Sequence, residues 1–360
     1  MTGRFVNLKA TLIPLIILLA ATSNLTQAAL EDSFCDSTGN LSIQNLNLKG
    51  GKFSPGQELQ RVTIPISYTC TISYTTYGPG YRPTLGVTPS FQSVINSLKG
   101  SGLALDVIIQ ESGQTPVTFP WSELKRAVTS GSSITKGFGA WLPNPRPPTP
   151  APPYNLNGNM TLRFFVDSAF ITNKPISIKV PGIPAFQILS HDPDGVGAKA
   201  GKPITTSTFN IRFIPDYSGR VIVSPSVVRM GHFYTDYNDT LAKQVPFTVT
   251  AQQNLGAGSP FSAPLAIEFK TTGLTLTDSG RAVILHNTDG QLNGLKLVVE
   301  DEASTPVIFN SVVPMGTINM GYEPNGKIIK TYTATVTPIS GETVKTGNFS
   351  VAMTITITYI

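Results

Sequence analysis

The chain has 360 residues, enough for two domains of ordinary size, and a formal net charge of +5 at pH 7. Charged residues make up only 13 % of it, whereas 32 glycines and 29 prolines together make up about 17 %, against a usual share near 12 %. Low charge combined with 40 % hydrophobic residues excludes intrinsic disorder, and the many glycines and prolines argue against a helical protein. We therefore expect an all-β protein of short strands separated by turns.

Residues 1–28 have the pattern of a secretory signal peptide. Arg4 and Lys9 precede the apolar run 12–21, and the small-residue sequence Thr26-Gln27-Ala28 follows it. The apolar run is about half as long as a membrane span. Removing this segment takes away two positive charges and no negative ones, which leaves a formal charge of +3. Because no basic run is interleaved with aromatic residues, we expect no nucleic-acid partner. Since no later stretch reaches membrane-spanning length, we expect the mature chain to be exported and soluble.

Cys35 and Cys70 are the only cysteines. In an oxidising compartment they are expected to form a disulfide, and closing a loop of this length is worth about 4 kcal/mol in the chain-entropy model. The alternative is two free thiols, one of them a nucleophile. That alternative is disfavoured because no histidine lies within about a hundred residues of either cysteine in the sequence.

Apolar residues recur at every second position from Leu41 onward, which is typical of half-buried strands. Clear examples are Val62, Ile64 and Ile66, and later the segment 162–166. Only the segments 91–98 and 121–128 have a helical pattern. Many short strands with frequent turns predict β-sandwich domains.

The turn-rich segment 215–219 divides the mature chain. We predict an N-terminal β-sandwich domain over residues 29–216 and a C-terminal domain over residues 217–360. The proline-rich segment 143–153 is interpreted as an extended loop within the first domain, because strand-like alternation resumes directly after it.

The end of the chain carries the sharpest pattern. Small or polar residues separate six alternating apolar ones, namely Phe349, Val351, Met353, Ile355, Ile357 and Tyr359. This alternation predicts one long strand that buries one face. No residues follow to cover its free edge, and an exposed apolar edge is a site of association with other chains. The alternative is a last strand paired on both sides within its own sheet.

Together these features resemble the two-domain tip adhesins of bacterial chaperone–usher fimbriae, such as the type 1 fimbrial adhesins. Pilin domains of that family end in an alternating strand with a penultimate tyrosine, here Tyr359, and a glycine fourteen residues from the end, here Gly347. The segments 219–225 and 245–256 resemble the family's first two pilin strands. The usual disulfide between those strands is absent, since the corresponding positions are Val227 or Val228 and Thr250.

The resemblance implies an incomplete immunoglobulin-like pilin domain that lacks its last strand. A periplasmic fimbrial chaperone would lend a strand and hold the terminal carboxylate of Ile360. At the outer-membrane usher, the next pilin subunit would then replace the chaperone as strand donor. Only Ala29–Phe34 precede Cys35 in the mature chain, too few for a donor strand, so the resemblance places the protein at the fimbrial tip on the bacterial surface.

An enzyme is disfavoured. Ser122-Glu123-Leu124-Lys125 fits S-x-x-K and Lys345-Thr346-Gly347 fits K-T-G, but the third element of penicillin-binding enzymes is missing between them. Asp192-Pro193-Asp194-Gly195 lacks the remaining ligands of a calcium loop and is interpreted as a turn. The three histidines lie far apart in the sequence, so we expect no catalytic site, no cofactor and no metal.

A carbohydrate site requires aromatic faces and polar side chains. The N-terminal candidates for binding a host or surface glycan are Trp121, Trp141, Tyr154, Asp192 and Asp194. We therefore expect a fimbrial tip adhesin that binds a carbohydrate through its first domain. The alternative is a minor structural fimbrial subunit that binds no sugar.

Overall fold

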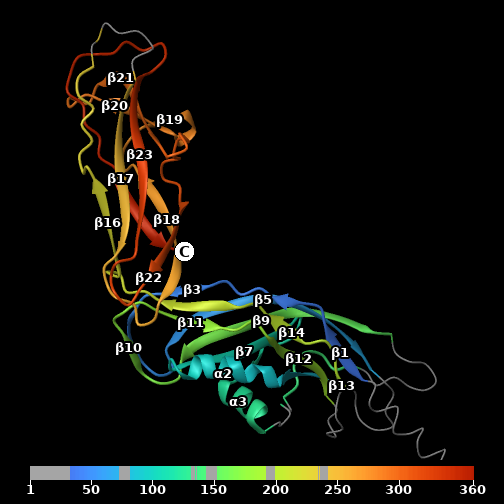
Figure 1. The fold of residues 1–360 in the computed structure, drawn as a ribbon. Coiled ribbons are helices and arrows are strands. Elements are labelled where there is room, and N and C mark those ends of the chain that lie inside the picture. Colours follow the sequence, from blue (N-terminus) through green and yellow to red (C-terminus); the bar gives the residue numbers. More distant parts are fainter. Residues whose placement is uncertain are drawn as a thin grey trace, which may run out of the picture. The chain divides into compact units, whose positions relative to one another are not determined.

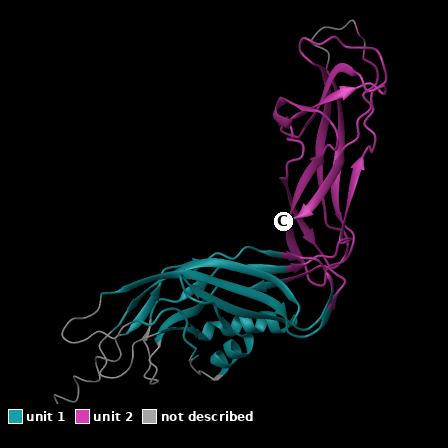
Figure 2. Ribbon diagram, turned by 180° about the vertical axis from the view of Figure 1, so that it is seen from behind, with its two compact units in different colours: residues 1–46, 52–170, 178–211 teal, residues 47–51, 171–177, 212–360 magenta. Residues whose placement is uncertain are grey.

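The computed structural model describes residues 33–72, 82–130, 134, 136–142, 152–191, 199–233, 235 and 242–360. The expected signal peptide, Asp192 and Asp194 lie outside the described residues. The chain divides into two compact units, one from residues 1–46, 52–170 and 178–211, the other from residues 47–51, 171–177 and 212–360 (Figure 2). The second unit thus includes two short segments that a single cut of the sequence does not anticipate. The boundary after residue 216 stays a prediction.

The described part of the first unit is built on two main β-sheets (Figure 1). Its larger sheet has the strand order β13 (Lys199–Ala200), β1 (Phe34–Ser37), β5 (Glu58–Thr71), β9 (Tyr154–Val166), β7 (Leu103–Glu111) and β8 (Val117–Phe119). The smaller sheet has the order β2 (Asn40–Leu41), β14 (Ile204–Thr206), β12 (Pro184–His191) and β6 (Arg82–Val87). Three helical segments accompany them: η1 (Pro89–Phe91), α2 (Gln92–Lys99) and α3 (Trp121–Ser130).

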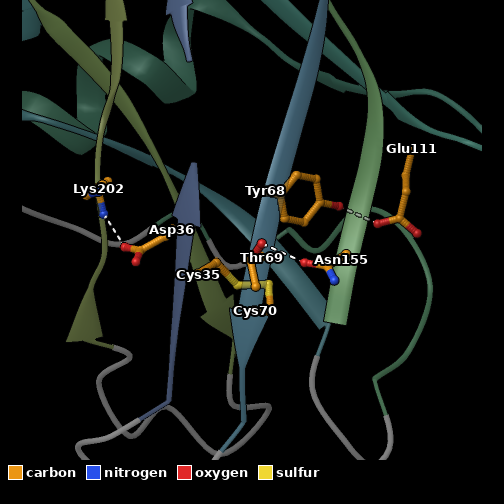
Figure 3. The surroundings of a disulfide bond; sticks show 8 residues. All are labelled: Cys35, Asp36, Tyr68, Thr69, Cys70, Glu111, Asn155 and Lys202. Carbon is orange, nitrogen blue, oxygen red and sulfur yellow. Dashed lines mark hydrogen bonds between the residues drawn. A yellow bond between two sulfur atoms is a disulfide. The ribbon is translucent and has the colours of Figure 1, made fainter. Parts of the chain in front are cut away.

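The sequence pattern explains these elements. β5 and β9 pair antiparallel along almost their whole length, and alternate residues such as Ile66, Met160 and Leu162 are buried. Both segments predicted to be helical are helical. The predicted disulfide between Cys35 and Cys70 is also confirmed, with the two residues directly opposite each other on β1 and β5 (Figure 3).

Five further short strands form two small sheets. One has the order β11 (Ile176–Val180), β15 (Phe209–Phe213) and β3 (Leu46–Leu48), and the other pairs β10 (Phe170–Thr172) with β4 (Gly51–Phe53).

The second unit is a sandwich of two antiparallel sheets. The larger has the order β16 (Gly219–Ser224), β17 (Lys243–Gln253), β23 (Lys327–Pro338), β21 (Leu292–Glu300), β20 (Ala282–His286) and β19 (Leu276–Thr277). The smaller has the order β22 (Val313–Met320), β18 (Phe261–Lys270) and β24 (Thr354–Tyr359). A 3-10 turn, η2 (Asp278–Gly280), completes the unit. Its core includes Val249, Ile267, Phe269, Val283 and Ile318.

These sheets confirm the predicted all-β fold with β-sandwich architecture. Two details differ from expectation. Thr250 lies opposite Ile222, so the register does not bring it to Val227 or Val228. The final strand covers only Thr354–Tyr359 rather than the whole segment from Phe349, because β18 ends at Lys270, which is the residue paired with Thr354.

Candidate functional site

The last strand of the chain has a neighbour on one side only. β24 pairs antiparallel with β18, from Thr354 opposite Lys270 to Tyr359 opposite Leu265. Within the described part of the chain, no strand pairs with the other side of β24, which is therefore an edge of the smaller sheet. Such an edge has backbone N–H and C=O groups without sheet partners, and a further strand can pair with them.

The apolar side chains of β24 point into the core but are incompletely covered. The opposed pairs are Ile355 with Phe269, Ile357 with Ile267 and Tyr359 with Leu265. Directly opposite residues point to the same face of a sheet. The three β18 residues are at most 2 % exposed, whereas their three β24 partners are only half-buried. The apolar surface that remains exposed therefore belongs to β24, the strand that pairs on one side only.

The segment before β24 continues the same pattern. Phe349, Val351 and Met353 are half-buried and pack against the core of the second unit, while Ser350 and Ala352 between them are exposed. The alternation predicted from the sequence is thus maintained in side-chain orientation, although within the described chain this part of the segment pairs only through an isolated antiparallel bridge between Phe349 and Asn287.

Core-facing residues of β16 are also incompletely buried. Val221 and Val223 of β16 lie opposite the buried Ala251 and Val249, so they face the core. Val221 is nevertheless 42 % exposed and Val223 is only half-buried. An inward-facing valine with that exposure indicates that the core is open beside it.

The two incompletely covered segments approach each other at both ends. A Cβ atom added to Gly219 would lie 2.9 Å from the Tyr359 hydroxyl. At the other end, the rings of Phe233 and Phe349 are 5.9 Å apart. Between these contacts, the described residues form no backbone hydrogen bond from one segment to the other. We call the segments 219–233 and 349–359 together the open edge.

A turn at Gly347 fixes the start of the final segment. Gly347 has φ of +148°, which favours glycine, and an added Cβ would lie 2.5 Å from the Asn287 side-chain nitrogen. Asn287 Nδ2 donates to the Thr346 carbonyl at 3.0 Å, and the Thr288 N–H donates to the Asn348 carbonyl at 2.8 Å. The motif glycine is therefore required by conformation and by packing.

The terminal segment of the open edge is uncharged, whereas the segment 219–233 carries Arg220 and Arg229. No acidic or basic side chain occurs between Gly347 and Ile360. Burial raises the pKa of Tyr359, so its hydroxyl is neutral at physiological pH. The Ile360 N–H donates to the Pro264 carbonyl at 3.0 Å, and the Ile360 side chain is exposed. These features suit an apolar partner strand rather than a charged ligand.

The opposite edge of the same sheet has different properties. On β22, the inward-facing Met315, Ile318 and Met320 are at most 2 % exposed. Pro314 lies within the strand, and the pairing register shifts between Leu265 and Ala266 of β18. Proline and bulges are typical of edges that do not accept another strand.

The predicted carbohydrate residues of the first unit have unlike environments. Trp121, the first residue of α3, is buried and lies edge-on to Phe91 at 6.2 Å, so its ring is part of the core. Trp141 is 53 % exposed. Tyr154 begins β9, opposite Cys70, and is half-buried. The described structure places Tyr154 next to the disulfide.

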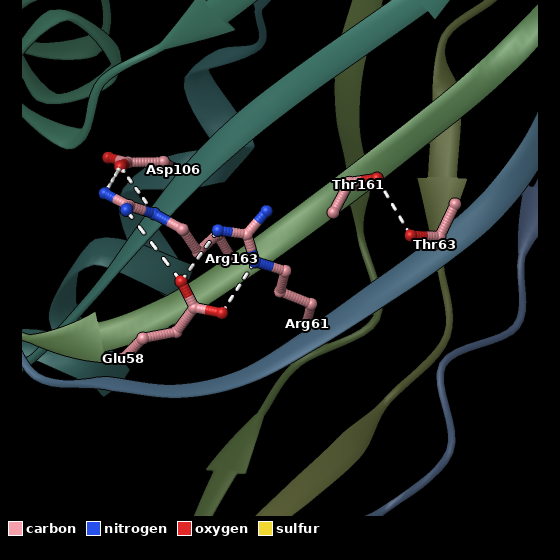
Figure 4. A network of polar contacts seen from close by, with 6 residues as sticks. All are labelled: Glu58, Arg61, Thr63, Asp106, Thr161 and Arg163. Atoms are coloured by element: carbon pink, nitrogen blue, oxygen red, sulfur yellow. Dashed lines mark hydrogen bonds and ion pairs between the residues drawn. The ribbon is translucent and has the colours of Figure 1, made fainter.

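A charged network, of which only Asp106 is buried, lies at the start of α3 and was not predicted from the sequence. Asp106 is buried, accepts the Trp121 N–H at 2.8 Å and binds the Arg163 guanidinium. Glu58 binds Arg61 and lies 3.9 Å from Arg163 (Figure 4). Side-chain hydrogen bonding to Arg61 is the main cause that lowers the pKa of Glu58. The contact from Asp106 fixes the start of α3 to the larger sheet, and the opposite charges of Glu58 and Arg61, three residues apart, were the sequence signal for part of the network.

Residues that suggested other chemistry belong to different units. Ser122 belongs to the first unit and Lys345 to the second. Among the described residues, no three His, Cys, Asp or Glu side chains are grouped to hold a metal ion. A search of the described residues also finds no helix that is long and apolar enough to span a membrane.

Comparisons with known proteins give matches at the level of structure. No family model and no curated protein matches the sequence. The P pilus rod subunit PapA is 17 % identical over 39 % of this chain and 99 % of its own, with a TM-score of 0.29. The CupB6 tip adhesin of Pseudomonas aeruginosa is 9 % identical over 91 % and 93 % of the two chains, with a TM-score of 0.29.

A third match is a chain in the CsuC–CsuE chaperone–tip adhesion subunit pre-assembly complex, from archaic chaperone–usher Csu pili of Acinetobacter baumannii. It is 8 % identical over 90 % of this chain and 99 % of its own, with a TM-score of 0.21. These three solved structures are a pilus rod subunit and two pilus tip subunits.

Proposed function

We propose that this protein is the adhesive tip subunit of a chaperone–usher fimbria. Its second unit accepts a strand from another chain, and its first unit binds a carbohydrate receptor. The observation that carries the proposal is the open edge, where β24 has one strand neighbour and its core-facing side chains are only half-buried.

Strand addition suits this edge for two physical reasons. The unpaired backbone groups of β24 would gain hydrogen bonds, which gives affinity without regard to sequence. The alternating half-buried side chains would be covered by an alternating partner. Completing the burial of six apolar side chains contributes on the order of 5 kcal/mol. A strand from another chain therefore completes the core of the second unit.

The partners are those that the resemblance to chaperone–usher fimbrial subunits implies. A periplasmic chaperone supplies the strand first and holds the carboxylate of Ile360 with basic residues. At the outer-membrane usher, the next subunit replaces it as strand donor. The protein is then exposed on the bacterial surface at the tip of the fibre. The exposed side chain of Ile360 supports access to this end of the chain.

Carbohydrate binding is proposed for the first unit. Trp141, Tyr154, Asp192 and Asp194 are the candidate contact residues, and the exposed ring of Trp141 gives the most direct support. Trp121 is better explained as a core residue, because its buried ring has no free face for a sugar. The alternative is a minor structural subunit with the same strand-accepting unit and no glycan ligand.

Strand acceptance is tested with a synthetic peptide of alternating valine and threonine, about twelve residues long, and a peptide of the same composition in which the period is broken. We expect the alternating peptide to bind the mature chain and to raise its melting temperature, while the control peptide does neither. A mature chain that is monomeric, stable alone and indifferent to both peptides contradicts the proposal.

The adhesive role is tested by screening the peptide-complemented chain on a diverse glycan array. Reproducible binding to a defined glycan class supports the tip adhesin. Strand acceptance without any glycan binding favours the structural subunit instead.

A further inference from the structure

One segment of the first unit links the edge strands of its two main sheets. We call residues Lys136–Leu142 the strap. The Phe138 N–H donates to the Pro83 carbonyl of β6 at 2.7 Å, and Thr84 Oγ1 donates to the Lys136 carbonyl at 2.8 Å. Lys136 Nζ donates to the Thr118 carbonyl of β8 at 2.8 Å. Because β6 and β8 end their respective sheets, the strap joins the two layers along one side.

The interior of the strap is held by packing. Phe138 is fully buried and lies edge-on to Tyr68 at 6.1 Å and to Phe119 at 6.2 Å. Leu142, at the other end, is also buried. Two buried apolar residues within five positions fix the path of the backbone between them.

A buried carboxylate fixes the strap just before Trp141. Glu111 accepts the Ala140 N–H at 2.9 Å and the Tyr68 hydroxyl, the latter contact being visible in Figure 3. Gly139 has φ of +73°, and a Cβ there would lie 2.3 Å from Glu111 Oε2. The Gly139 carbonyl accepts Arg82 Nε at 3.0 Å. The backbone that presents Trp141 is therefore held by specific contacts on the two residues before it.

Trp141 itself is exposed while its neighbours are fixed. Among the described residues of the first unit, it is the only large hydrophobic side chain that is exposed. A protein interface needs a cluster of buried apolar anchors. A single indole on a rigid backbone suits a saccharide, whose C–H groups stack on one aromatic face at little entropic cost.

We propose that Trp141 is a saccharide-contact residue and that Glu111 is its positioning residue, acting through Gly139 and Ala140. This inference rests on the proposed carbohydrate-binding function and specifies where that function lies. Glu111 does not touch the sugar. It fixes the backbone from which the indole extends.

The test uses the full mature chain complemented with the alternating peptide. A panel of immobilised mono- and disaccharides identifies a binding sugar, and titration with it gives affinities for each variant. Trp141→Ala is expected to weaken binding about tenfold, the scale of one lost stacking contact. Gly139→Ala is expected to weaken it severalfold, because the new methyl group displaces the strap from Glu111.

Gly113→Ala is the matched control. Gly113 also has positive φ, +77°, but an added Cβ there has nothing within 4 Å. It therefore reproduces the backbone strain without touching the strap, and its affinity should equal that of the natural chain. In a Trp141→Ala background, Gly139→Ala should cause no further loss, because both changes act through the same ring.

Tyr68→Phe provides a second route should Gly139→Ala fail to fold, since it removes only the hydroxyl bonded to Glu111. A severalfold loss of affinity is expected, with the melting temperature of the second unit unchanged.

If the Trp141→Ala variant binds the sugar as tightly as the unmodified chain does, this inference is overturned, while the proposal of carbohydrate binding stands. Failure of the unmodified, strand-complemented chain to bind any sugar overturns both the inference and the lectin proposal. The inference is also overturned if the first unit binds a peptide ligand rather than a saccharide and the Trp141→Ala variant loses that binding.

Discussion

The two edge strands of the three-stranded sheet, β22 and β24, differ in how completely their core-facing side chains are buried. β22 and β24 both pair with β18, and both direct alternate apolar residues to the core. On β22 those residues are buried, and a proline and a register shift interrupt the edge. On β24 they are half-buried, and neither proline nor charge interrupts the run. The core-facing side chains of β22 are buried without a further strand beside them, whereas those of β24 are not. This contrast teaches that β24 is an edge at which the core itself lacks a neighbouring strand.

The largest effect is expected from a charge on the inward face of β24. Ile355→Asp places a carboxylate opposite the buried Phe269, and we expect a loss of about 3 kcal/mol or more once the strand partner covers it. The subunit should then fail to accumulate in the periplasm, as measured by immunoblotting. Thr358→Asp, at an exposed position of the same strand, is the control and should accumulate normally. Equal accumulation of both variants would contradict the assigned orientation of β24.

A smaller effect is expected from the turn that starts the final segment. Gly347→Ala introduces both strain and a clash with Asn287, and should lower the free energy of unfolding by about 2–3 kcal/mol in urea titrations. Gly341 also has a positive φ, but no atom lies within 4 Å of an added Cβ. Gly341→Ala should therefore lower the free energy of unfolding by only about 1 kcal/mol. If the two variants lose the same stability, the Asn287 contact has no role.

Gly219→Ala tests the end of the open edge where Tyr359 lies. The added methyl group would crowd the Tyr359 hydroxyl, and we expect a cost of about 1 kcal/mol in thermal unfolding. Removing the hydroxyl with Tyr359→Phe should restore most of that loss in the double variant. An unchanged cost in the double variant would mean that the two residues do not interact.

The smallest effect is expected at the other edge. Pro314→Thr restores a backbone N–H to β22 and should change the free energy of unfolding by about 0.5 kcal/mol at most. Binding of the alternating peptide should keep its stoichiometry of one, measured by calorimetry. A second peptide bound by this variant would show that the proline alone protects β22.

Sequence patterns predicted much of this fold because the strands alternate so regularly. The run from Phe349 to Tyr359 indicated which side chains face the core, and the two cysteines allowed only one intrachain disulfide. The length of the last strand was not predictable, since it depends on where β18 ends. The alternation of apolar residues indicates which way the side chains point. The extent of strand pairing depends instead on β18, which lies nearly a hundred residues earlier in the chain.

The candidate sites were predictable to different degrees. Trp121 and Trp141 are alike as residue types, and only tertiary packing makes one buried and the other exposed. Glu111 gave no signal, because a carboxylate at the end of a strand normally faces solvent. The glycines on either side of Phe138 were the one local feature that could have indicated the strap.

The central claim is that a partner strand adds to β24 and not to β22. Hydrogen exchange of the mature chain, with and without the alternating peptide, measures this directly for both strands. We predict that backbone amides of Thr354–Tyr359 gain protection on peptide binding while those of Val313–Met320 remain unchanged. Protection gained at Val313–Met320, or at neither strand, would contradict the account.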